Sequence, residues 1–201
     1  MALTRLGLNQ AVNLATNATG TLGVANGGTG LTSGTTDQFL KFTGSTTLAS
    51  AADNAGKILQ VTHRQRTGQS IVTSTSGFEA TPTYGSITPS SSSNKVLVMI
   101  TLPSSYHSTS NGGLIKVVRE SSVVSTGGSI AGSALQEDQF NAYKGTNDIQ
   151  TAKPAFTFLD EPNTTSAVHY QIFIKNRADG AFYLGQSGTP VHDVTLMEIS
   201  A

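Results

Sequence analysis

The chain has 201 residues with no net formal charge, and only 12 % of them are charged. No basic field is therefore available to hold phosphates, and nucleic acid is not an expected partner. The absence of cysteine excludes structural disulfides, thiolate metal sites and cysteine nucleophiles. Ser and Thr make up about a quarter of the chain, 21 residues are Gly and 37 % are hydrophobic, a mix that favours β structure over disorder.

The first 17 residues carry scattered apolar side chains that fit neither a strand period nor a helix period. Two interpretations remain open for them: a frayed terminus, or a segment that buries its leucines against a partner. Arg5 is the only charge and polar residues interrupt every apolar run, so we expect no signal peptide. No stretch of the chain approaches the ~18 apolar residues of a membrane helix, so we expect no membrane insertion.

Residues 18–55 are dominated by Thr, Ser, Gly, Ala and Asn, and their apolar residues are mostly isolated. Neither a heptad repeat nor the Gly-X-Y repeat of collagen is present. One interpretation is a flexible linker. The other is a fibrous shaft, in which three extended chains wind about one axis and order one another. Gln38–Phe42 is the exception, because its pattern predicts a short strand.

The composition changes at Gly56, since residues 57–201 hold 20 of the 24 charged residues and nearly all apolar runs. About 145 residues bury roughly two thirds of their unfolded surface, which is enough for an independent core. Nine short strands separated by turn residues are predicted there. They are Lys57–Thr62, Ser70–Ser74, Phe78–Ile87, Lys95–Leu102, Gly113–Glu120, Phe156–Leu159, Val168–Lys175, Phe182–Leu184 and Val191–Ile199. This spacing predicts an all-β fold, an antiparallel β-sandwich of jelly-roll-like type.

Some segments of this domain carry more specific expectations. The near-continuous apolar run Lys95–Leu102 is typical of a strand buried on both faces. Gly113–Glu120 is expected to pair with Val123–Val124. Gln136–Ala142 is the best candidate for a helical turn. Ala178–Gly180 is a tight hairpin signal that would pair the strands on either side of it.

A family resemblance begins at Val24–Gly30, Val-Ala-Asn-Gly-Gly-Thr-Gly, followed by Leu-Thr-Ser. This run resembles a segment in the proximal shafts of bacteriophage tail fibres, notably those of phages of cyanobacteria and other aquatic bacteria. Ile87–Val98 and Val194–Ile199 resemble an inner hairpin and the last strand of the C-terminal heads in that family.

The resemblance implies a homotrimer with three parts: a virion-attachment segment at residues 1–17, a fibrous shaft at 18–55 and a β-sandwich head at 56–201. It implies synthesis in the host cytoplasm and a place in the virion tail. The N-terminal segment would bind a phage tail or baseplate protein. Its candidate attachment residues are Leu3, Leu6, Leu8, Val12 and Leu14.

No motif in the sequence predicts catalysis, a cofactor or a metal site. Thr29 stands where a phosphate-binding loop needs Lys, and no Gly-x-Ser-x-Gly elbow occurs. His192–Asp193 is only a weak hint of a hydrolytic triad, and the four histidines form no His-x-His pair. The adjacent carboxylates Glu137–Asp138 and Asp160–Glu161 are expected to be solvated loop charges, not a glycosidase pair. We therefore predict a protein that is not an enzyme and needs no cofactor.

Aromatic residues are scarce at 6 %, so those in polar segments are the candidates for ligand binding. Tyr106 and His107 lie in one such segment, and Gln139 and Tyr143 lie in another. A tyrosine ring stacks on the apolar face of a sugar while amide groups satisfy its hydroxyls, so these residues suit a glycan. The alternative is that the aromatic side chains pin their loops to the core.

Three functional hypotheses follow from the sequence. In the first, the protein is a homotrimeric tail fibre that docks through its N-terminus and recognises a host-surface glycan through its head. In the second, the trimer is a connector or decoration of the virion with no receptor. In the third, which the short chain disfavours, the protein is a fibre-borne depolymerase of polysaccharides.

Overall fold

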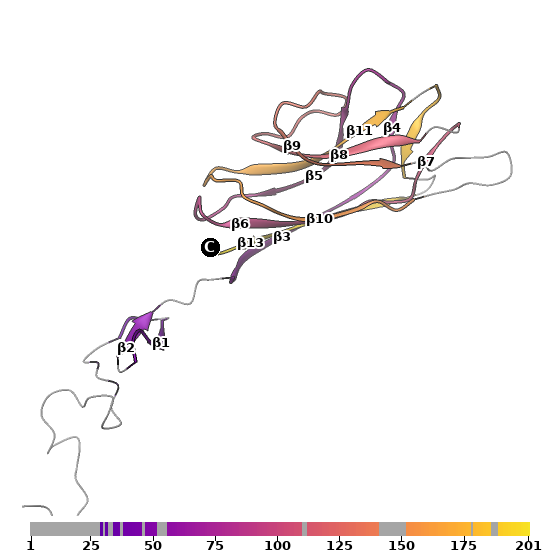
Figure 1. Ribbon diagram of the computed structural model, residues 1–201. Coiled ribbons are helices and arrows are strands. Elements are labelled where there is room, and N and C mark those ends of the chain that lie inside the picture. The colour runs from indigo at the N-terminus through magenta and orange to yellow at the C-terminus, as the bar shows by residue number, and fades with distance from the viewer. Residues whose placement is uncertain are drawn as a thin grey trace, which may run out of the picture. The chain divides into compact units, whose positions relative to one another are not determined.

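The computed structural model describes residues 29, 31, 34–36, 38–45, 47–51, 56–109, 112–140, 152–177, 179–185 and 189–201 (Figure 1). The chain divides into two units, Met1–Asn54 and Ala55–Ala201, and each is described separately. The candidate attachment residues lie outside the described residues: Leu3, Leu6, Leu8, Val12 and Leu14. The attachment segment, the shaft and the trimer therefore stay predictions.

In the first unit the described residues include one hairpin, formed by β1 (Phe39–Phe42) and β2 (Leu48–Ala51). The strand predicted at Gln38–Phe42 is confirmed. Phe39 and Phe42 stay 63 % and 69 % exposed, and Leu40 between them is exposed as well. A lone two-stranded hairpin is at best marginally stable in water, so these side chains need a covering surface that the described residues do not supply.

In the second unit the described residues form eleven strands and no helix. The strands are β3 (Ile58–Thr67), β4 (Ser70–Val72), β5 (Glu79–Ile87), β6 (Lys95–Thr101), β7 (Ser105–His107), β8 (Gly113–Glu120), β9 (Ser133–Phe140), β10 (Ala155–Asp160), β11 (Val168–Asn176), β12 (Phe182–Leu184) and β13 (Val191–Ile199). They make two four-stranded sheets and one three-stranded sheet, and every pairing is antiparallel. The all-β prediction is confirmed.

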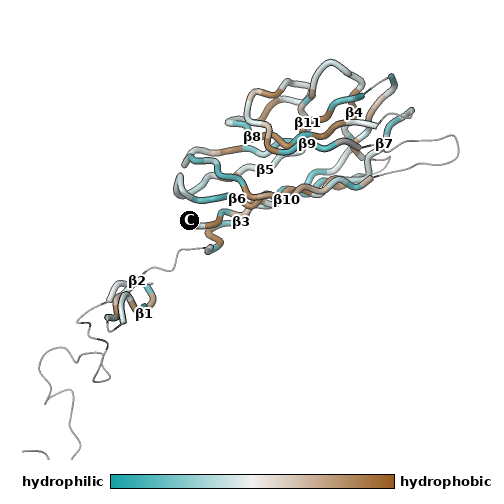
Figure 2. Tube along the Cα trace, in the orientation of Figure 1, coloured by the Kyte–Doolittle hydropathy of each residue, from teal (hydrophilic) through white to brown (hydrophobic). Residues whose placement is uncertain are grey.

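The two four-stranded sheets lie face to face (Figure 1). The first sheet has the strand order β10-β6-β13-β3, and the second sheet has the order β5-β11-β8-β9. Alternate residues of each strand point into the space between them, as the twofold period of a strand requires. Figure 2 shows the resulting mixture of hydrophobic and polar residues along the strands. The main core includes Val96, Val98, Ile100, Ile115, Val117, Tyr170, Ile172, Ile174, Val194 and Leu196. The expected β-sandwich is therefore confirmed.

The strand β6 departs from the prediction in one respect. Val96, Val98 and Ile100 are buried, but Leu97 is only half-buried and Met99 is 40 % exposed. The expectation of burial on both faces is wrong, because nothing in the described part of the chain covers the outer face of the first sheet.

The outer face of the second sheet is covered, and residues 121–132 cover it. Val124 and Ile130 of that segment pack on the buried cluster of Ala80, Val118 and Phe173. Gln171 fixes the segment, because its Oε1 accepts from the Val124 N–H at 2.9 Å and its Nε2 donates to the Val124 carbonyl at 2.8 Å. The predicted pairing of Gly113–Glu120 with Val123–Val124 is wrong, since β8 pairs with β9 and β11 instead.

The helical turn predicted at Gln136–Ala142 is also wrong up to residue 140. Residues 133–140 form β9, an edge strand whose backbone pairs with β8 from Arg119 with Ser133 to Gly113 with Phe140. Its register with β8, a contact distant in sequence, decides this conformation over the local preference of a polar segment.

Polar side chains close one side of the sandwich. The inward residues of β3 reach the edge strand β5, where Gln60 donates to the Thr88 carbonyl just beyond it and Thr62 donates to the Ser86 carbonyl. Arg64 donates to the Tyr84 carbonyl at 3.1 Å, and its guanidinium lies 3.5 Å from the centre of the Tyr84 ring. These bonds satisfy edge carbonyls that a further strand would otherwise have to pair.

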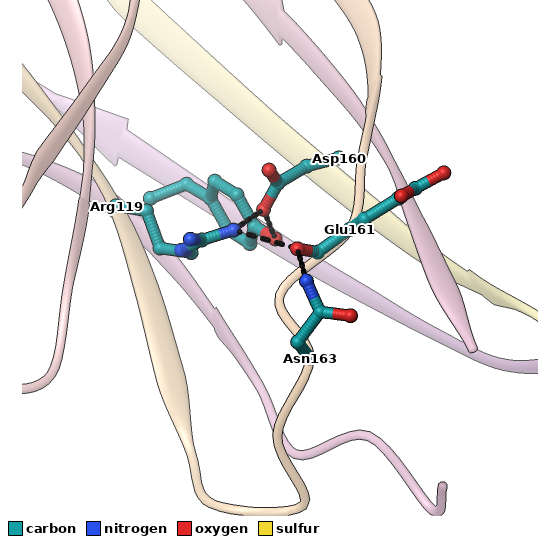
Figure 3. Close-up of polar contacts among 5 residues, drawn as sticks. Arg119, Asp160, Glu161 and Asn163 are labelled. Carbon is teal, nitrogen blue, oxygen red and sulfur yellow. Dashed lines mark hydrogen bonds and ion pairs between the residues drawn. The ribbon is translucent and has the colours of Figure 1, made fainter. Parts of the chain in front are cut away.

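A buried carboxylate ties the two sheets together. Asp160 of β10 accepts at one oxygen from Arg119 of β8 at 2.6 Å and from the hydroxyl of Tyr170 of β11 at 2.7 Å. Figure 3 shows Arg119 directed at Asp160 and at the carbonyl of Glu161, which also accepts from Asn163. Burial, and then the hydrogen bond to Asp160, raise the pKa of Tyr170 well above its usual value. The first member of the adjacent pair Asp160–Glu161 is thus structural, since Asp160 is buried and one of its oxygens accepts from both Arg119 and Tyr170.

Candidate functional site at the distal sheet

The three-stranded sheet lies at the end of the second unit opposite to the point where the chain enters it. The entry is fixed by Gly56, whose N–H donates to the carbonyl of Ser200 at the other end of the chain. From Ile58 the ten residues of β3 lead away from that point over roughly 30 Å, and β4 follows directly after a turn at Gly68. Figure 1 shows β4 and β7 far from the C-terminus. We name the sheet β4-β12-β7 the distal sheet.

The outer face of the distal sheet carries a row of three large side chains. Tyr183 at the centre of β12 is paired in register with Ile71 of β4 on one side and with Tyr106 of β7 on the other. The two tyrosine rings are stacked, with centroids 4.7 Å apart and planes inclined by 4°. Ile71 is 53 % exposed, and both tyrosines are half-buried. The hydroxyl groups of both tyrosines lack a hydrogen-bond partner among the described residues, so an incoming polar group can pair with them.

The inner face of the same sheet is built into the core. Phe182 and Leu184 of β12 and Val72 of β4 are buried, as the alternation of each strand requires. Gly113 is needed beneath Phe182, because a Cβ at that position would lie 2.2 Å from the Phe182 ring. The hairpin expectation at Ala178–Gly180 is corrected here: Gly180 does take a turn conformation with φ of 106°, but β12 pairs with β4 and β7, not with β11.

His107 supports this sheet from below. It is fully buried, its Nδ1 accepts from the Thr109 N–H at 3.0 Å, and its Nε2 lies 2.6 Å from Asn176 Oδ1. Since Nδ1 is an acceptor, the proton of the neutral ring sits on Nε2 and is donated to Asn176. Asn176 in turn donates to the Gly180 carbonyl at 2.8 Å. The network joins the end of β11, the turn at Gly180 and β7, and so it holds Tyr106 in place.

Two hollows lie beside the outer strands of the distal sheet. Next to β4, a hollow of about 360 Å³ is lined by Ile71 together with Arg66, Ser70, Glu79 and others. Before β7, a second hollow of about 450 Å³ is lined by Ser104, Lys153, Asp193 and others. Each hollow therefore offers groups of both charge signs and hydroxyls within one element of the tyrosine row, which is the mixture that sugar hydroxyls bind.

The guanidinium of Arg66 in the first of these hollows is held by its own turn. Its Nη1 donates to the Gly68 carbonyl at 2.9 Å and to the Ser70 hydroxyl at 3.2 Å, and its Nη2 donates to the Gln69 carbonyl. Burial, and then the charge of Arg64, lower the pKa of Arg66 from its usual value. Arg66 is thus pre-positioned at the wall of the hollow.

The residues predicted from sequence are placed as follows. Tyr106 stands on the outer face of the distal sheet, whereas His107 points inward and is a support. Gln139 belongs to β9, where its backbone pairs with Leu114 of β8, and β9 does not pair with β7. Tyr143 lies outside the described residues. The sequence reasoning missed Tyr183, although the alternation Phe-Tyr-Leu in a three-residue strand was the signal that could have found it.

The His192–Asp193 pair, a weak hint of a hydrolytic triad in the sequence, makes structural contacts. His192 is buried, with Nδ1 2.9 Å from the Thr83 hydroxyl and Nε2 2.9 Å from the Gly68 carbonyl, while the adjacent Asp193 faces outward to Gln65. Burial chiefly lowers the pKa of His192. Among the described residues no three of His, Asp and Glu are grouped closely enough to hold a metal ion. The same residues contain no helix long and apolar enough to cross a membrane.

Comparisons with known proteins leave the family open. No protein-family model matches the chain, and no curated protein sequence matches it. Solved structures of infectious bursal disease virus are similar at a low level: one of the Gx strain at 10 % identity and a TM-score of 0.37, and one of the VP2 subviral particle at 9 % and 0.33. Each covers 80 % of this chain, which spans only 36 % and 37 % of the viral chains. At such TM-scores the likeness carries no argument about function.

Proposed function

We propose that the protein is a homotrimeric structural protein of a phage virion, a tail fibre whose head binds a glycan on the host surface through the distal sheet. The observation that carries the proposal is the in-register row Ile71–Tyr183–Tyr106 on the sheet that lies farthest from the chain's entry. A fibre must present its receptor site at the end away from its attachment, and the row occupies that end of the folded unit.

The chemistry of the row supports a sugar ligand over a protein one. Two stacked rings with unpaired hydroxyls present an apolar edge and polar tips together, which matches the apolar face and the hydroxyls of a pyranose. The polar hollows beside β4 and β7 supply further hydrogen-bonding groups. Three such sites in one fibre bind with avidity, so the affinity of each single site can be low. The proposal assigns the protein no enzymatic activity, and N-terminal docking to a tail or baseplate protein belongs to it as well.

The test is binding of the full chain to an array of bacterial surface polysaccharides. Tyr183→Ala and Tyr106→Ala should each weaken the binding of the best polysaccharide about tenfold, since losing a stacking ring costs about 1–2 kcal/mol. Val123→Ala is the matched control, because Val123 is also exposed but lies on the segment over the second sheet. Circular dichroism shows whether the variants keep the fold.

Two results would overturn the receptor role. Unchanged polysaccharide binding in both tyrosine variants would place the site elsewhere. If the wild-type protein binds no polysaccharide but is retained by tail proteins, the connector hypothesis replaces the receptor hypothesis.

A further inference from the structure

The outer faces of the two large sheets differ in a way that needs an explanation. Residues 121–132 cover the second sheet so fully that Phe173 on its outer side has no exposed surface. The first sheet has no such cover among the described residues. Leu159, Leu97, Met197 and Val61 form one continuous row across its four strands, with each residue paired to the next in register. Leu159 and Val61 at the two ends are 53 % and 54 % exposed.

Most of the apolar residues on this face lie in the half near the chain's entry. Beyond the row, the start of β3 is hydrophobic (Figure 2), and Ile58 and Leu59 there are 52 % and 41 % exposed. Toward the distal sheet the rows are mixed: Met99 and Val191 are 40 % and 38 % exposed, and Asp193 beside them pairs with His63 and Gln65. We name the residues Ile58, Leu59, Val61, Leu97, Leu159 and Met197 the entry patch. None of these six residues is charged, and the nearby charges of Lys95 and Glu161 pair with each other at 2.6 Å.

The size of the face sets what it can bind. With strands about 4.8 Å apart and residues about 3.3 Å apart, four strands of seven residues cover roughly 19 Å by 23 Å. Monomeric proteins rarely expose an apolar patch of more than a few hundred Å². The entry patch takes up about half of this face, whereas a stable interface buries about 800 Å² on each partner, so the patch supplies roughly a quarter of that area and requires a second contribution.

The second contribution lies immediately upstream in the same chain. Phe39, Leu40 and Phe42 of β1 are exposed, and the hairpin that carries them ends at Ala51, only seven residues before β3. Two consecutive elements of one chain thus expose apolar side chains. Copies of this chain assembled in parallel cover both elements at once, and an uncharged patch faces its own copy with no repulsion.

We propose that the entry patch is the self-association surface of the head, packed around a threefold axis against the entry patches of two further copies. This inference rests on the homotrimer of the proposed function and names the surface that would form it. It also gives a reason for the apolar residue Leu97 on the outer side of β6: neighbouring subunits would bury it, whereas Val96, Val98 and Ile100 are buried within their own subunit.

The experiment measures the mass of the full chain by sedimentation equilibrium. The wild-type protein should have three times the 20.8 kDa mass of one chain. Val61→Lys combined with Leu159→Lys should shift it to single chains at the same concentration, since three pairs of ammonium groups would be buried in an apolar interface. Ile71→Lys is the matched control: Ile71 is 53 % exposed and apolar but lies on the distal sheet, so that variant should remain trimeric.

A cross-link gives an independent measurement, because the natural chain has no cysteine. Because a threefold interface joins different residues of neighbouring copies, Val61→Cys combined with Leu159→Cys should give covalent dimers and trimers on mild oxidation, and Ile71→Cys should not. A wild-type trimer that survives the double lysine substitution and yields no such cross-link would overturn the assigned surface and leave the fibre function standing. A wild-type monomer would overturn both the surface and the homotrimer.

Discussion

The substitution Glu198→Gln tests how a buried carboxylate holds the entry end of the sandwich. Glu198 is fully buried on the inner side of β13. Its Oε1 accepts from the Ser90 N–H and the Asn94 amide, both at 2.6 Å, and its Oε2 accepts from Gln60 at 2.6 Å. A glutamine cannot reproduce this set, because its NH₂ group would face the donor of Gln60.

The expected cost follows from the pKa of Glu198. Burial alone would raise it, but the hydrogen bonds from Asn94, Gln60 and Ser90 outweigh burial and lower the pKa from 4.5 to about 2. At about 1.36 kcal/mol per pKa unit, the ionised group contributes about 3 kcal/mol to the free energy of unfolding. Because the folded pKa is depressed, this contribution is complete above pH 4.5 and is lost as the pH falls toward 2.

The assay is urea denaturation of wild type and variant at one fixed protein concentration. At pH 7 we expect Glu198→Gln to unfold more easily by about 3 kcal/mol, and we expect the difference to shrink steadily between pH 4.5 and pH 2. Glu137→Gln is the control, since Glu137 lies on an edge strand, its side chain is 45 % exposed and it forms a surface ion pair with Lys116. This substitution should cost about 0.5 kcal/mol or less. A difference that is the same at pH 7 and pH 2.5 would refute the reasoning.

Two further predictions concern the outer cover and the distal sheet. Gln171→Leu leaves the N–H and carbonyl of Val124 unpaired, so it should lower the free energy of unfolding by about 2 kcal/mol and make residues 121–132 the first site of limited proteolysis. If residues 121–132 resist the protease in the variant as well as they do in the wild type, this prediction is contradicted. Gly113→Ala forces the Phe182 ring to move and so displaces β12, which should weaken polysaccharide binding although Gly113 itself cannot touch a ligand on the outer face. Unchanged binding together with unchanged stability would show that the distal sheet does not depend on this contact.

The parts of the fold that the sequence predicted are those where each strand carries its own pattern. Val168–Asn176 alternates so regularly that its core face, Tyr170, Ile172 and Ile174, was evident. The exception in that pattern, Phe173, is explained by the segment that crosses the outer face of the second sheet. A single chain's pattern gives the faces of a strand but not what covers each face.

The parts that could not be predicted depend on contacts between distant residues. The sequence of β9 is polar and locally favours a turn, and its pairing with β8 makes it a strand. β7 has only three residues, and its pairing with β12 makes it a strand. The same limit applies to the candidate site. Tyr106 was a candidate from its polar surroundings, but Tyr183 joins it only through register, and His107 was separated from it only by the alternation of the strand.

Assembly is the central claim, since the shaft, the entry patch and the avidity of the distal sheet all require identical neighbours. The most direct measurement is the mass of the wild-type full chain in solution over a range of concentrations. We predict about 62 kDa, three times the 20.8 kDa of one chain, and a single 20.8 kDa species at every concentration would contradict this assembly.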